Sequence, residues 1–282
     1  MTNAIEIRDL CKSYPGFELD HLNLTLPSGY ILGFVGENGA GKSTTIRMLL
    51  NLTDRDSGEV SVLEHDPSEA DASWKNDVGA VLDTMGLPSM VKADQVGKIM
   101  ADAFTNWDSD KYEYYLKRLD VPKDKRFMDM SNGTKMKLGI AIALSHDAKV
   151  LILDEATNGL DPLVRDDVNE ILMEFTRQPD HSIFISSHIV SDLEKICDYI
   201  AFIHKGKLML CEEKDKLSSE YGILSCTEDD LNSIDPDAIL HTTKNAYGCQ
   251  AVVRRDSIPA SLSTAQITIE ELFVLMAKEE LK

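Results

Sequence analysis

The residues best placed to do chemistry form one run near the start of the chain, Gly36-Glu37-Asn38-Gly39-Ala40-Gly41-Lys42-Ser43-Thr44. Its spacing is that of a glycine-rich phosphate-binding loop, G-x-x-x-x-G-K-S. Glycines let successive backbone N–H groups point into one concavity, which suits the oxygens of a phosphate. Lys42 supplies a positive charge for the β- and γ-phosphates, and the Ser43 hydroxyl is a ligand for Mg²⁺. The run therefore predicts that the chain binds a nucleoside triphosphate.

The segments on either side are those that such a loop requires. Residues 31–35 form an apolar run that is typical of a buried strand. After the loop, Ile46, Leu49 and Leu50 recur at the spacing of one helix face, and a helix N-terminus adds partial positive charge for a phosphate. The alternative is an ordinary strand-to-helix turn that matches by chance, and both flanks argue against it.

A second group of polar residues follows two further apolar runs. Residues 150–153 are typical of an interior parallel strand, and Asp154 and Glu155 come directly after them. Because ligands bind outside the carboxyl ends of such strands, we expect Asp154 to face Mg²⁺ and Glu155 to act as general base on a water. The run at residues 183–185 leads to His188 at the same edge, close to a γ-phosphate. Helix N-terminal charges and a structural histidine are the alternatives.

Two weaker candidates depend on fewer residues. Tyr14 lies in a predicted loop between two strands, where it either packs on the surface or stacks on a base, a contact worth about 1–3 kcal/mol. Ser131-Asn132-Gly133-Thr134 opens a predicted helix, for which Ser131 is a good N-cap. These four residues alone do not distinguish a cap from a ligand contact.

The remaining pattern predicts the elements that must position these residues. Residues 4–35 begin with an antiparallel pair of strands, and residues 78–82 form another buried strand that ends at Asp83. From about 85 to 146 the pattern becomes helical, with Trp107 and residues 112–115 as core aromatics. Because this segment separates two strands of the nucleotide domain, it is predicted to be an inserted helical subdomain.

The pattern changes again towards the C-terminus. Residues 199–211 predict a hairpin, and beyond about 214 short strands recur at 238–240 and 250–253. A capping box from Thr268 to Glu271 opens a final helix. We expect an α/β fold: a P-loop ATPase core with an antiparallel β subdomain, an inserted helical subdomain and a small C-terminal α+β domain. The expected division is 1–215 for nucleotide binding and 216–282 for an accessory domain.

Composition excludes several classes of partner. With 282 residues the chain has room for one or two domains, and its net charge of −19 disfavours nucleic acid and anionic lipid surfaces. It has no apolar run long enough to span a bilayer and no signal-like start. Its five cysteines show no C-x-x-C pair, which favours free thiols in a reducing cytosol.

Taken in order, these motifs resemble those of the ATP-binding subunit of an ABC transporter, over roughly residues 4–212. The likeness is carried by Walker A (36–44), the signature position (131–134), Walker B with its glutamate (150–155), a D-loop (Gly159-Leu160-Asp161-Pro162), the switch histidine His188 and the adenine-stacking Tyr14. It implies catalytic roles for Glu155, His188 and Lys42, and metal contacts for Ser43, Asp154 and Asp83. It implies nucleotide contacts for Tyr14, the loop Gly36 to Thr44, Ser131, Gly133 and Asp161.

Two positions depart from the family pattern. Where the family usually has L-S-G-G-Q, this chain has Met130-Ser131-Asn132-Gly133-Thr134, which keeps the hydroxyl and one glycine. Where the family usually has the Q-loop glutamine, the matching position is Asp83. An acidic residue there can approach Mg²⁺ or the attacking water through a second water.

The resemblance also implies cofactors, partners and a location. ATP and Mg²⁺ are bound between two such subunits, identical or related, which pack head to tail. A membrane-spanning subunit holds the pair at the cytoplasmic face of the cell membrane, and no nucleic acid is involved. The stretch at Trp107-Asp108 and the small C-terminal domain look most like Gram-positive exporters of peptides, antibiotics or toxins, such as bacitracin-type and phenol-soluble-modulin exporters.

The main rival is a soluble ABC-type ATPase that acts on DNA or ribosomes. DNA-organising members carry a long coiled coil between Lys42 and the signature position, for which this chain has no room. Ribosome-acting members usually have two such domains in one chain, and the acidic charge argues against both. A GTP-binding switch would need an Asn/Thr-Lys-x-Asp motif, which the sequence lacks.

Overall fold

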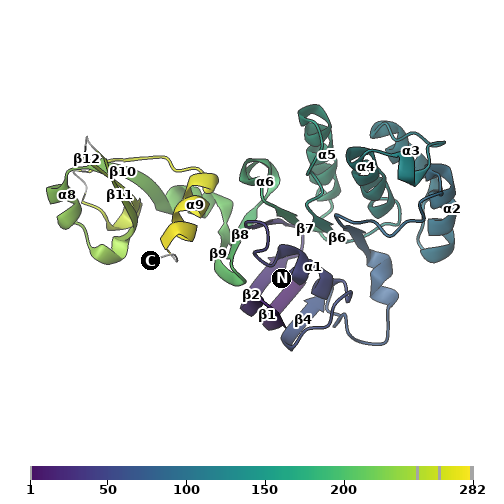
Figure 1. The fold of residues 1–282 in the computed structure, drawn as a ribbon, viewed down its shortest axis with the longest axis horizontal. Coiled ribbons are helices and arrows are strands. Elements are labelled where there is room, and N and C mark those ends of the chain that lie inside the picture. The colour runs from purple at the N-terminus through teal and green to yellow at the C-terminus, as the bar shows by residue number, and fades with distance from the viewer. Residues whose placement is uncertain (1, 246–247, 260–261, 280–282) are drawn as a thin grey trace.

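A six-stranded sheet with the order β5-β6-β7-β3-β8-β9 lies at the centre of the computed structural model (Figure 1). The structure describes residues 2–245, 248–259 and 262–279. The strands are β3 (Ile31–Val35), β5 (Val78–Val81), β6 (Val150–Asp154), β7 (Ser182–Ser187), β8 (Tyr199–His204) and β9 (Lys207–Glu213). The first five run parallel, and β9 returns antiparallel to β8 as the predicted hairpin. Every residue of β3, β6 and β7 is buried, which explains their continuous apolar runs.

The register of these strands brings the predicted site residues to one edge. Val35 at the end of β3 pairs with Ser187, and Asp154 at the end of β6 pairs with Ser186. The loop after β3, the carboxylates after β6 and His188 after β7 therefore all begin at the same height on neighbouring strands.

An antiparallel sheet, β2-β1-β4, packs beside the central sheet. Its strands are β1 (Asn3–Tyr14), β2 (Phe17–Pro27) and β4 (Ser57–Val62), and the predicted antiparallel pair is confirmed. Apolar residues of β1 and β2 share a core cluster with Phe34, Phe184 and the helix α1 (Lys42–Leu49). This second sheet thus supports the phosphate-binding loop and the helix that follows it.

The segment between β5 and β6 is helical, as predicted, and forms one end of the molecule (Figure 1). It contains α2 (Ala93–Ala103), α3 (Ser109–Arg118), the short 3₁₀ turn η2 (Phe127–Asp129) and α4 (Asn132–Ala143), and η1 (Ser73–Asp77) precedes β5. Tyr112 is buried and Trp107 packs against the same core, but Tyr114 is exposed. The prediction of a core role for Tyr114 is wrong because the buried face of α3 carries Tyr112 and Leu116, four residues apart.

Two helices lie between these inserted helices and the C-terminal part of the chain. They are α5 (Pro162–Phe175), which follows the predicted D-loop, and α6 (Val190–Ile196), which begins two residues after His188. Within the described residues no helix is both long and apolar enough to cross a bilayer.

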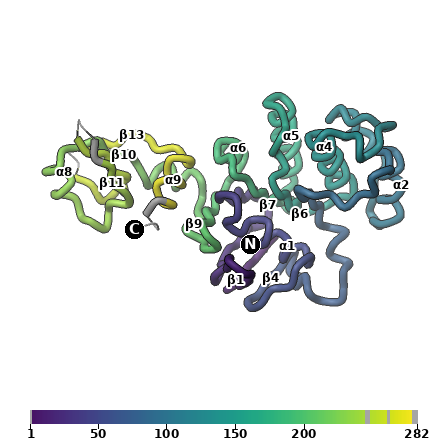
Figure 2. Tube along the Cα trace, viewed as in Figure 1, coloured from purple at the N-terminus to yellow at the C-terminus, as the bar shows by residue number. Residues whose placement is uncertain are grey.

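The C-terminal part forms the other end of the molecule and is built on the sheet β11-β12-β10-β13 (Figure 2). Its strands are β10 (Tyr221–Cys226), β11 (Ile239–Asn245), β12 (Gly248–Arg254) and β13 (Thr264–Ala265). Its helical elements are α7 (Lys214–Glu220), α8 (Glu228–Asn232), η3 (Pro236–Ala238), η4 (Arg255–Ser257) and α9 (Ile269–Glu279). The short strands predicted at 238–240 and 250–253 correspond to parts of β11 and β12. The predicted capping box is present, since Thr268 and Glu271 exchange hydrogen bonds ahead of α9.

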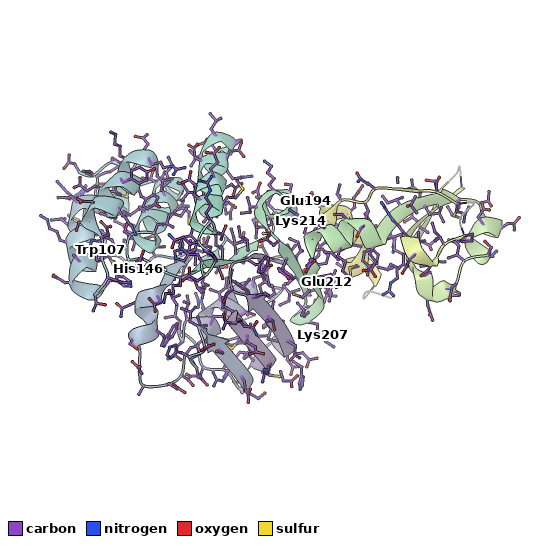
Figure 3. All side chains as sticks on the ribbon, turned by 180° about the vertical axis from the view of Figure 1, so that it is seen from behind. Trp107, His146, Glu194, Lys207, Glu212 and Lys214 are labelled. Atoms are coloured by element: carbon purple, nitrogen blue, oxygen red, sulfur yellow. The ribbon has the colours of Figure 1, made fainter. Side chains whose placement is uncertain are left out.

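The C-terminal sheet and the central sheet share contacts through α6 and α9. Glu194 on α6 accepts a hydrogen bond from the Ile269 backbone at 3.2 Å, and its carbonyl accepts one from the Lys214 ammonium at 3.0 Å (Figure 3). The ring centroids of Phe202 and Phe273 are 5.2 Å apart. The apolar core continues from β8 into α9 through these contacts.

Candidate functional site

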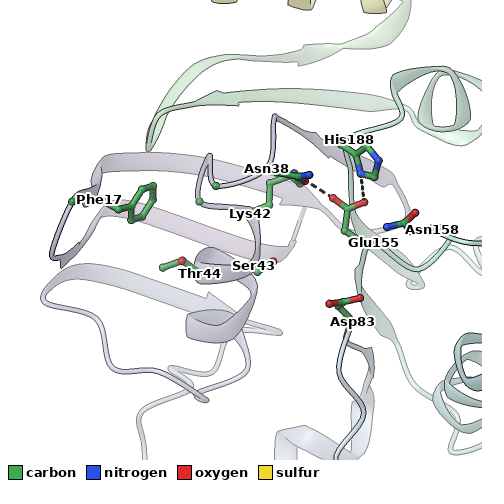
Figure 4. A pocket seen from close by; sticks show the side chains of 12 residues that line it. Phe17, Asn38, Lys42, Ser43, Thr44, Asp83, Glu155, Asn158 and His188 are labelled. Carbon is green, nitrogen blue, oxygen red and sulfur yellow. Dashed lines mark hydrogen bonds and ion pairs between the residues drawn. The ribbon is translucent and has the colours of Figure 1, made fainter. Parts of the chain in front are cut away.

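A cavity of about 600 Å³ opens at the carboxyl edge of the central sheet (Figure 4). This volume lies within the range of small-molecule sites. The lining combines the phosphate-binding loop with residues that follow β1, β5, β6 and β7: Gly16, Phe17, Asn38, Gly39, Gly41, Lys42, Ser43, Thr44, Asp83, Glu155, Asn158 and His188. Six of the nine predicted loop residues are therefore brought together with Asp83, Glu155 and His188 in one cavity, whose lining does not include Gly36, Glu37 or Ala40.

The loop conformation requires glycine at two of its positions. Gly41, the residue before α1, has φ +116°, and an added Cβ there would lie 3.0 Å from the Phe17 ring. At Gly36 a Cβ would lie only 2.5 Å from the carbonyl oxygen of Ile203. The loop consequently passes close to β2 and β8, and the free N–H groups at the start of α1 are available to an anion.

Lys42 is 5% exposed and is surrounded by oxygen atoms. Its Nζ donates to the carbonyl oxygens of Gly36 at 2.7 Å and Glu37 at 3.2 Å. The same Nζ lies 3.2 Å from Oε1 of Glu155, whose Oε2 lies 2.7 Å from Nδ1 of His188. Lys42, Glu155 and His188 thus form one continuous polar chain across the cavity (Figure 4).

Glu155 adopts a backbone conformation that a non-glycine residue rarely takes, with φ +53°. Its N–H donates to the Ser186 carbonyl at 3.2 Å and to the Ser186 hydroxyl at 3.1 Å, so β7 holds the backbone in place. Such backbone strain clusters at functional sites. The conformation is consistent with a role that depends on where the carboxylate points.

Asp154 and Ser43 provide oxygen atoms of the kind that Mg²⁺ prefers. Asp154 is 4% exposed, and its Oδ1 accepts a hydrogen bond from the Ser186 hydroxyl at 2.7 Å. In the described ranges no three His, Cys, Asp or Glu side chains cluster as a metal cage would. This donor set fits Mg²⁺, which takes one or two carboxylates and keeps several waters and substrate phosphates as ligands.

Phe17, rather than Tyr14, is the aromatic residue in the cavity lining. Tyr14 is the last residue of β1, is exposed and has the Lys12 ammonium 5.6 Å from its ring centroid. Phe17 is its strand partner at the start of β2. The sequence predicted a stacking role for Tyr14 and none for Phe17, which follows Gly16 as the first residue of β2.

Other predicted nucleotide contacts lie outside this cavity. Ser131 caps α4, since its hydroxyl accepts a hydrogen bond from the Thr134 N–H at 3.1 Å, and Gly133 lies in the first turn of that helix. Asp161 caps α5 by accepting from the Val164 N–H, also at 3.1 Å. Within one chain Ser131 and Asp161 therefore act as helix caps.

Asn158 lines the cavity but was not singled out from the sequence. Its N–H donates to the Glu155 carbonyl at 2.9 Å, so it sits in the turn that follows β6. The available signal was its position three residues after Glu155, at the sheet edge where ligands bind.

Comparison with known proteins gives a consistent result. The family described as "ABC transporter" matches residues 19–158. The bacitracin transport ATP-binding protein BcrA of Bacillus licheniformis is 34% identical over 212 residues, which cover 74% of this chain and 69% of that protein. The lantibiotic transport ATP-binding protein SrtF of Streptococcus pyogenes is 34% identical over 216 residues, which cover 75% of this chain and 91% of that protein.

Solved structures share the fold. One described as the structure of an ATP-binding subunit of an ABC transporter has a TM-score of 0.68 at 24% identity and covers 76% of this chain and 91% of its own. A dimeric ATP-binding cassette in a post-hydrolysis state, bound to ADP and Pi, has a TM-score of 0.68 at 17% identity. The match covers 74% of this chain and 98% of that structure's chain. At this level of identity, the likeness concerns the fold alone.

Proposed function

This chain belongs to the ABC transporter family as an ATP-binding subunit that hydrolyses ATP, and we propose that it powers the export of a peptide antibiotic or toxin. The class of cargo is supported by BcrA and SrtF, whose names link them to bacitracin and lantibiotic transport. The alternative of an ATPase acting on DNA or ribosomes finds no support among these relatives.

Within the cavity we assign roles by position. The backbone N–H groups of the loop and the Lys42 ammonium bind the phosphates, and Phe17 or Tyr14 contacts the base. Ser43 and Asp154 would hold Mg²⁺, with Asp83 acting through a water, and the bound ion would supply positive charge next to the phosphates. Glu155 is the general base, and His188 orients it through the 2.7 Å contact.

One observation carries the catalytic assignment: the same carboxylate contacts both Lys42 and His188. The Lys42 ammonium prefers phosphate oxygens, which are more highly charged than one carboxylate. When phosphates occupy the loop, Lys42 turns to them and Oε1 of Glu155 becomes available to a water. A positioned general base is worth about 10²–10⁴-fold in rate.

ATP-binding subunits of this family act as dimers and with membrane-spanning subunits, and here we propose a second copy or a related subunit. Ser131 and Gly133 lie outside their own chain's cavity, so they are free to cover the γ-phosphate of a facing subunit. Asp161, at the N-terminus of α5, also lies outside its own chain's cavity and is proposed as a further nucleotide contact across the same interface. The membrane partner would contact residues 83–107, and the complex would lie at the cytoplasmic face of the membrane. Residues 1–215 would form the nucleotide-binding domain and 216–282 the accessory domain.

Glu155→Gln tests the proposed reaction. The variant should keep nucleotide binding, lose at least 10²-fold in steady-state ATP hydrolysis and accumulate as an ATP-bound dimer on size exclusion. Glu59→Gln is the matched control, because Glu59 is exposed on β4 and is not part of the cavity lining. Hydrolysis by Glu155→Gln at the wild-type rate would remove the role assigned to this carboxylate.

Co-purification of a multi-spanning protein from native membranes tests the transport role.

A further inference from the structure

Glu37 belongs to the phosphate-binding loop, but its side chain does not line the cavity. It turns instead to the tip of the β8–β9 hairpin. Its Oε1 lies 2.8 Å from Nδ1 of His204 and accepts a hydrogen bond from the Lys205 N–H at 3.3 Å. The carboxylate therefore joins the outer side of the loop to the hairpin.

The same hairpin tip holds the loop at a second point. The Gly206 N–H donates to the carbonyl oxygen of Ala40 at 2.9 Å, and the Gly206 carbonyl accepts from the Asp20 N–H at the same distance. Gly206 has no room for a Cβ, which would overlap the carbonyl of Glu18. The tip is thus fixed to β2 on one side and to the loop on the other.

His204 is 7% exposed, and neither of its ring nitrogens has an aligned hydrogen bond in the described part of the chain. The close contact with the Glu37 carboxylate is consequently its main polar interaction in the described part of the chain. Burial opposes ionisation of Glu37, but the contacts with His204 and with backbone N–H groups outweigh it and hold the pKa of Glu37 below its ordinary value. A charged carboxylate at this position favours the contact.

We propose that Glu37 and His204 are positioning residues, which hold the phosphate-binding loop in its binding shape without touching the nucleotide. The inference rests on the proposed role of the loop in binding ATP. Preorganised binding groups gain affinity because less order has to be created on binding. We call this Glu37–His204 contact the clasp. Releasing it should therefore weaken nucleotide affinity while leaving the chemical step unchanged.

A double-mutant cycle tests the clasp, with a fluorescent ATP analogue for affinity and steady-state hydrolysis for kcat and KM. Glu37→Ala and His204→Gln should each raise Kd and KM about 3–10-fold, while kcat stays within twofold of wild type. The double variant should bind the analogue no more weakly than the weaker-binding of the two single variants. Glu37→Gln, which keeps an acceptor for the Lys205 N–H, should recover part of the affinity. Asp20→Asn, which removes the Lys207 partner at the same hairpin tip, is the matched control and should not change Kd.

The outcomes separate the possible failures. A wild-type chain that ignores the analogue overturns the proposed function itself. Two results with a wild-type chain that binds normally would overturn the clasp. One is an effect of Glu37→Ala with none of His204→Gln, and the other is additive effects of the two substitutions. Either result would indicate that Glu37 contacts the nucleotide directly. Melting temperatures identify any variant that fails to fold, and Glu37, which is half-exposed, remains informative if His204→Gln does not.

A second inference concerns two thiols in the C-terminal sheet. Cys226 on β10 and Cys249 on β12 are directly opposite each other in an antiparallel pair. Opposite residues share a face and have Cα atoms about 4.5–5.5 Å apart, which falls within the range that a disulfide requires. Both cysteines are free, and Cys249 is 3% exposed whereas Cys226 is half-buried.

The geometry points to a dithiol that a small external disulfide can close. The Cys226 thiolate attacks the external disulfide and releases one thiol, and the Cys249 thiolate then attacks the sulfur of Cys226 and releases the second. The two cysteine protons pass to the two released thiolates, one Cys226–Cys249 bond forms, and the external disulfide is thereby reduced to two thiols. Burial and the neighbouring Cys249 thiol raise the pKa of Cys226, so the exchange should be faster in alkaline solution.

Oxidised glutathione added to the full chain provides the test, with free thiols then blocked by N-ethylmaleimide before peptide mass spectrometry. We expect a Cys226–Cys249 linked peptide that dithiothreitol removes, that Cys226→Ser and Cys249→Ser each abolish, and that the control Cys211→Ser retains. A stable glutathione adduct on Cys226 without the link, or a link to another cysteine, would overturn the inference. Cys226→Ser keeps the test decisive if the buried Cys249 variant does not fold.

Discussion

The Lys42 ammonium makes three short contacts with oxygen atoms, and one of these belongs to Glu155. A buried ammonium needs such partners, because an unpaired charge away from water is costly. Nucleotide phosphates must replace at least the Glu155 contact. The carboxylate that we propose as the base therefore also competes with the nucleotide for Lys42.

This competition predicts an effect of Glu155→Gln that is separate from hydrolysis. The amide carries no charge and binds Lys42 less strongly, so the affinity for ADP in EDTA should increase about 2–5-fold, since charged hydrogen bonds exceed neutral ones. Isothermal titration calorimetry with ADP in EDTA excludes contributions from hydrolysis. An unchanged or weaker ADP affinity would mean that Lys42 and Glu155 do not compete.

Individual residues of the site were predictable to different extents. Glu155 and His188 could be placed together because the carboxyl ends of parallel strands meet at one edge of the sheet. Phe17 could not, because its position depends on the shape of the turn between β1 and β2, whereas the position of Asn158 close after Glu155 offered a signal that was not used. Tyr14 and Phe17 flank the same turn, and the sequence does not say which ring faces the loop.

At the scale of elements, two helices begin at residues to which the resemblance gives a second role. Ser131 caps α4 and Asp161 caps α5, and both carry the ordinary hydrogen bonds of a helix N-terminus. A cap and a nucleotide contact make different demands on the side chain. A capping carboxylate satisfies the helix but repels a γ-phosphate.

Ser131→Asp and Ser131→Ala separate these two roles. The aspartate should keep the stability of the chain and still lower ATP hydrolysis at least tenfold if Ser131 covers a facing nucleotide. The alanine should cost about 1 kcal/mol of stability through the lost cap. Thermal unfolding and steady-state hydrolysis, measured on both variants, provide the check. Full hydrolysis by Ser131→Asp would leave Ser131 as a cap only.

The inserted helices are tied to α5 by a bidentate ion pair. Arg118 on α3 contacts Glu174 on α5 at 2.5 and 3.1 Å. The hydrogen bond from Arg118 lowers the pKa of Glu174, so the pair stabilises the fold above the ordinary pKa of a glutamate and loses this contribution as pH falls through the lowered value.

Glu174→Gln should therefore be destabilising only where the carboxylate is charged. At pH 7 we expect a loss of about 0.2–1 kcal/mol, because the pair is partly exposed. The difference in the free energy of unfolding between Glu174→Gln and wild type should disappear at acidic pH, where Glu174 is protonated in both the folded and the unfolded chain. Urea unfolding at the two pH values gives the comparison, and an equal difference at both would show that the charge is not responsible.

On the scale of the whole molecule, the order of the elements could be predicted better than their packing. The continuous apolar runs identified the central strands, and a change of period marked the inserted helices. Strand β10 was missed because Gly222 and the polar Ser225 interrupt its apolar pattern. The contact of α9 with α6 joins residues far apart in the sequence, and no local pattern encodes it.

The Phe202–Phe273 contact tests how far the two ends of the molecule depend on each other. Phe273→Ala removes a half-buried ring from α9 and should cost about 2 kcal/mol, less than a fully buried phenylalanine. If the two parts unfold together, a single thermal transition should shift to lower temperature. Two separate transitions, with only one of them shifted, would show that 216–282 unfolds independently and would support the proposed division.

Helix α6 has seven residues and is therefore a rod about 10 Å long. His188 stands just before one end of it, and Glu194, which receives the backbone of α9, stands near the other. We expect a displacement of α9 to move α6 and, through it, the segment that carries the imidazole beside Glu155. The C-terminal part of the chain is thus linked through α6 to the carboxylate that we propose as the base.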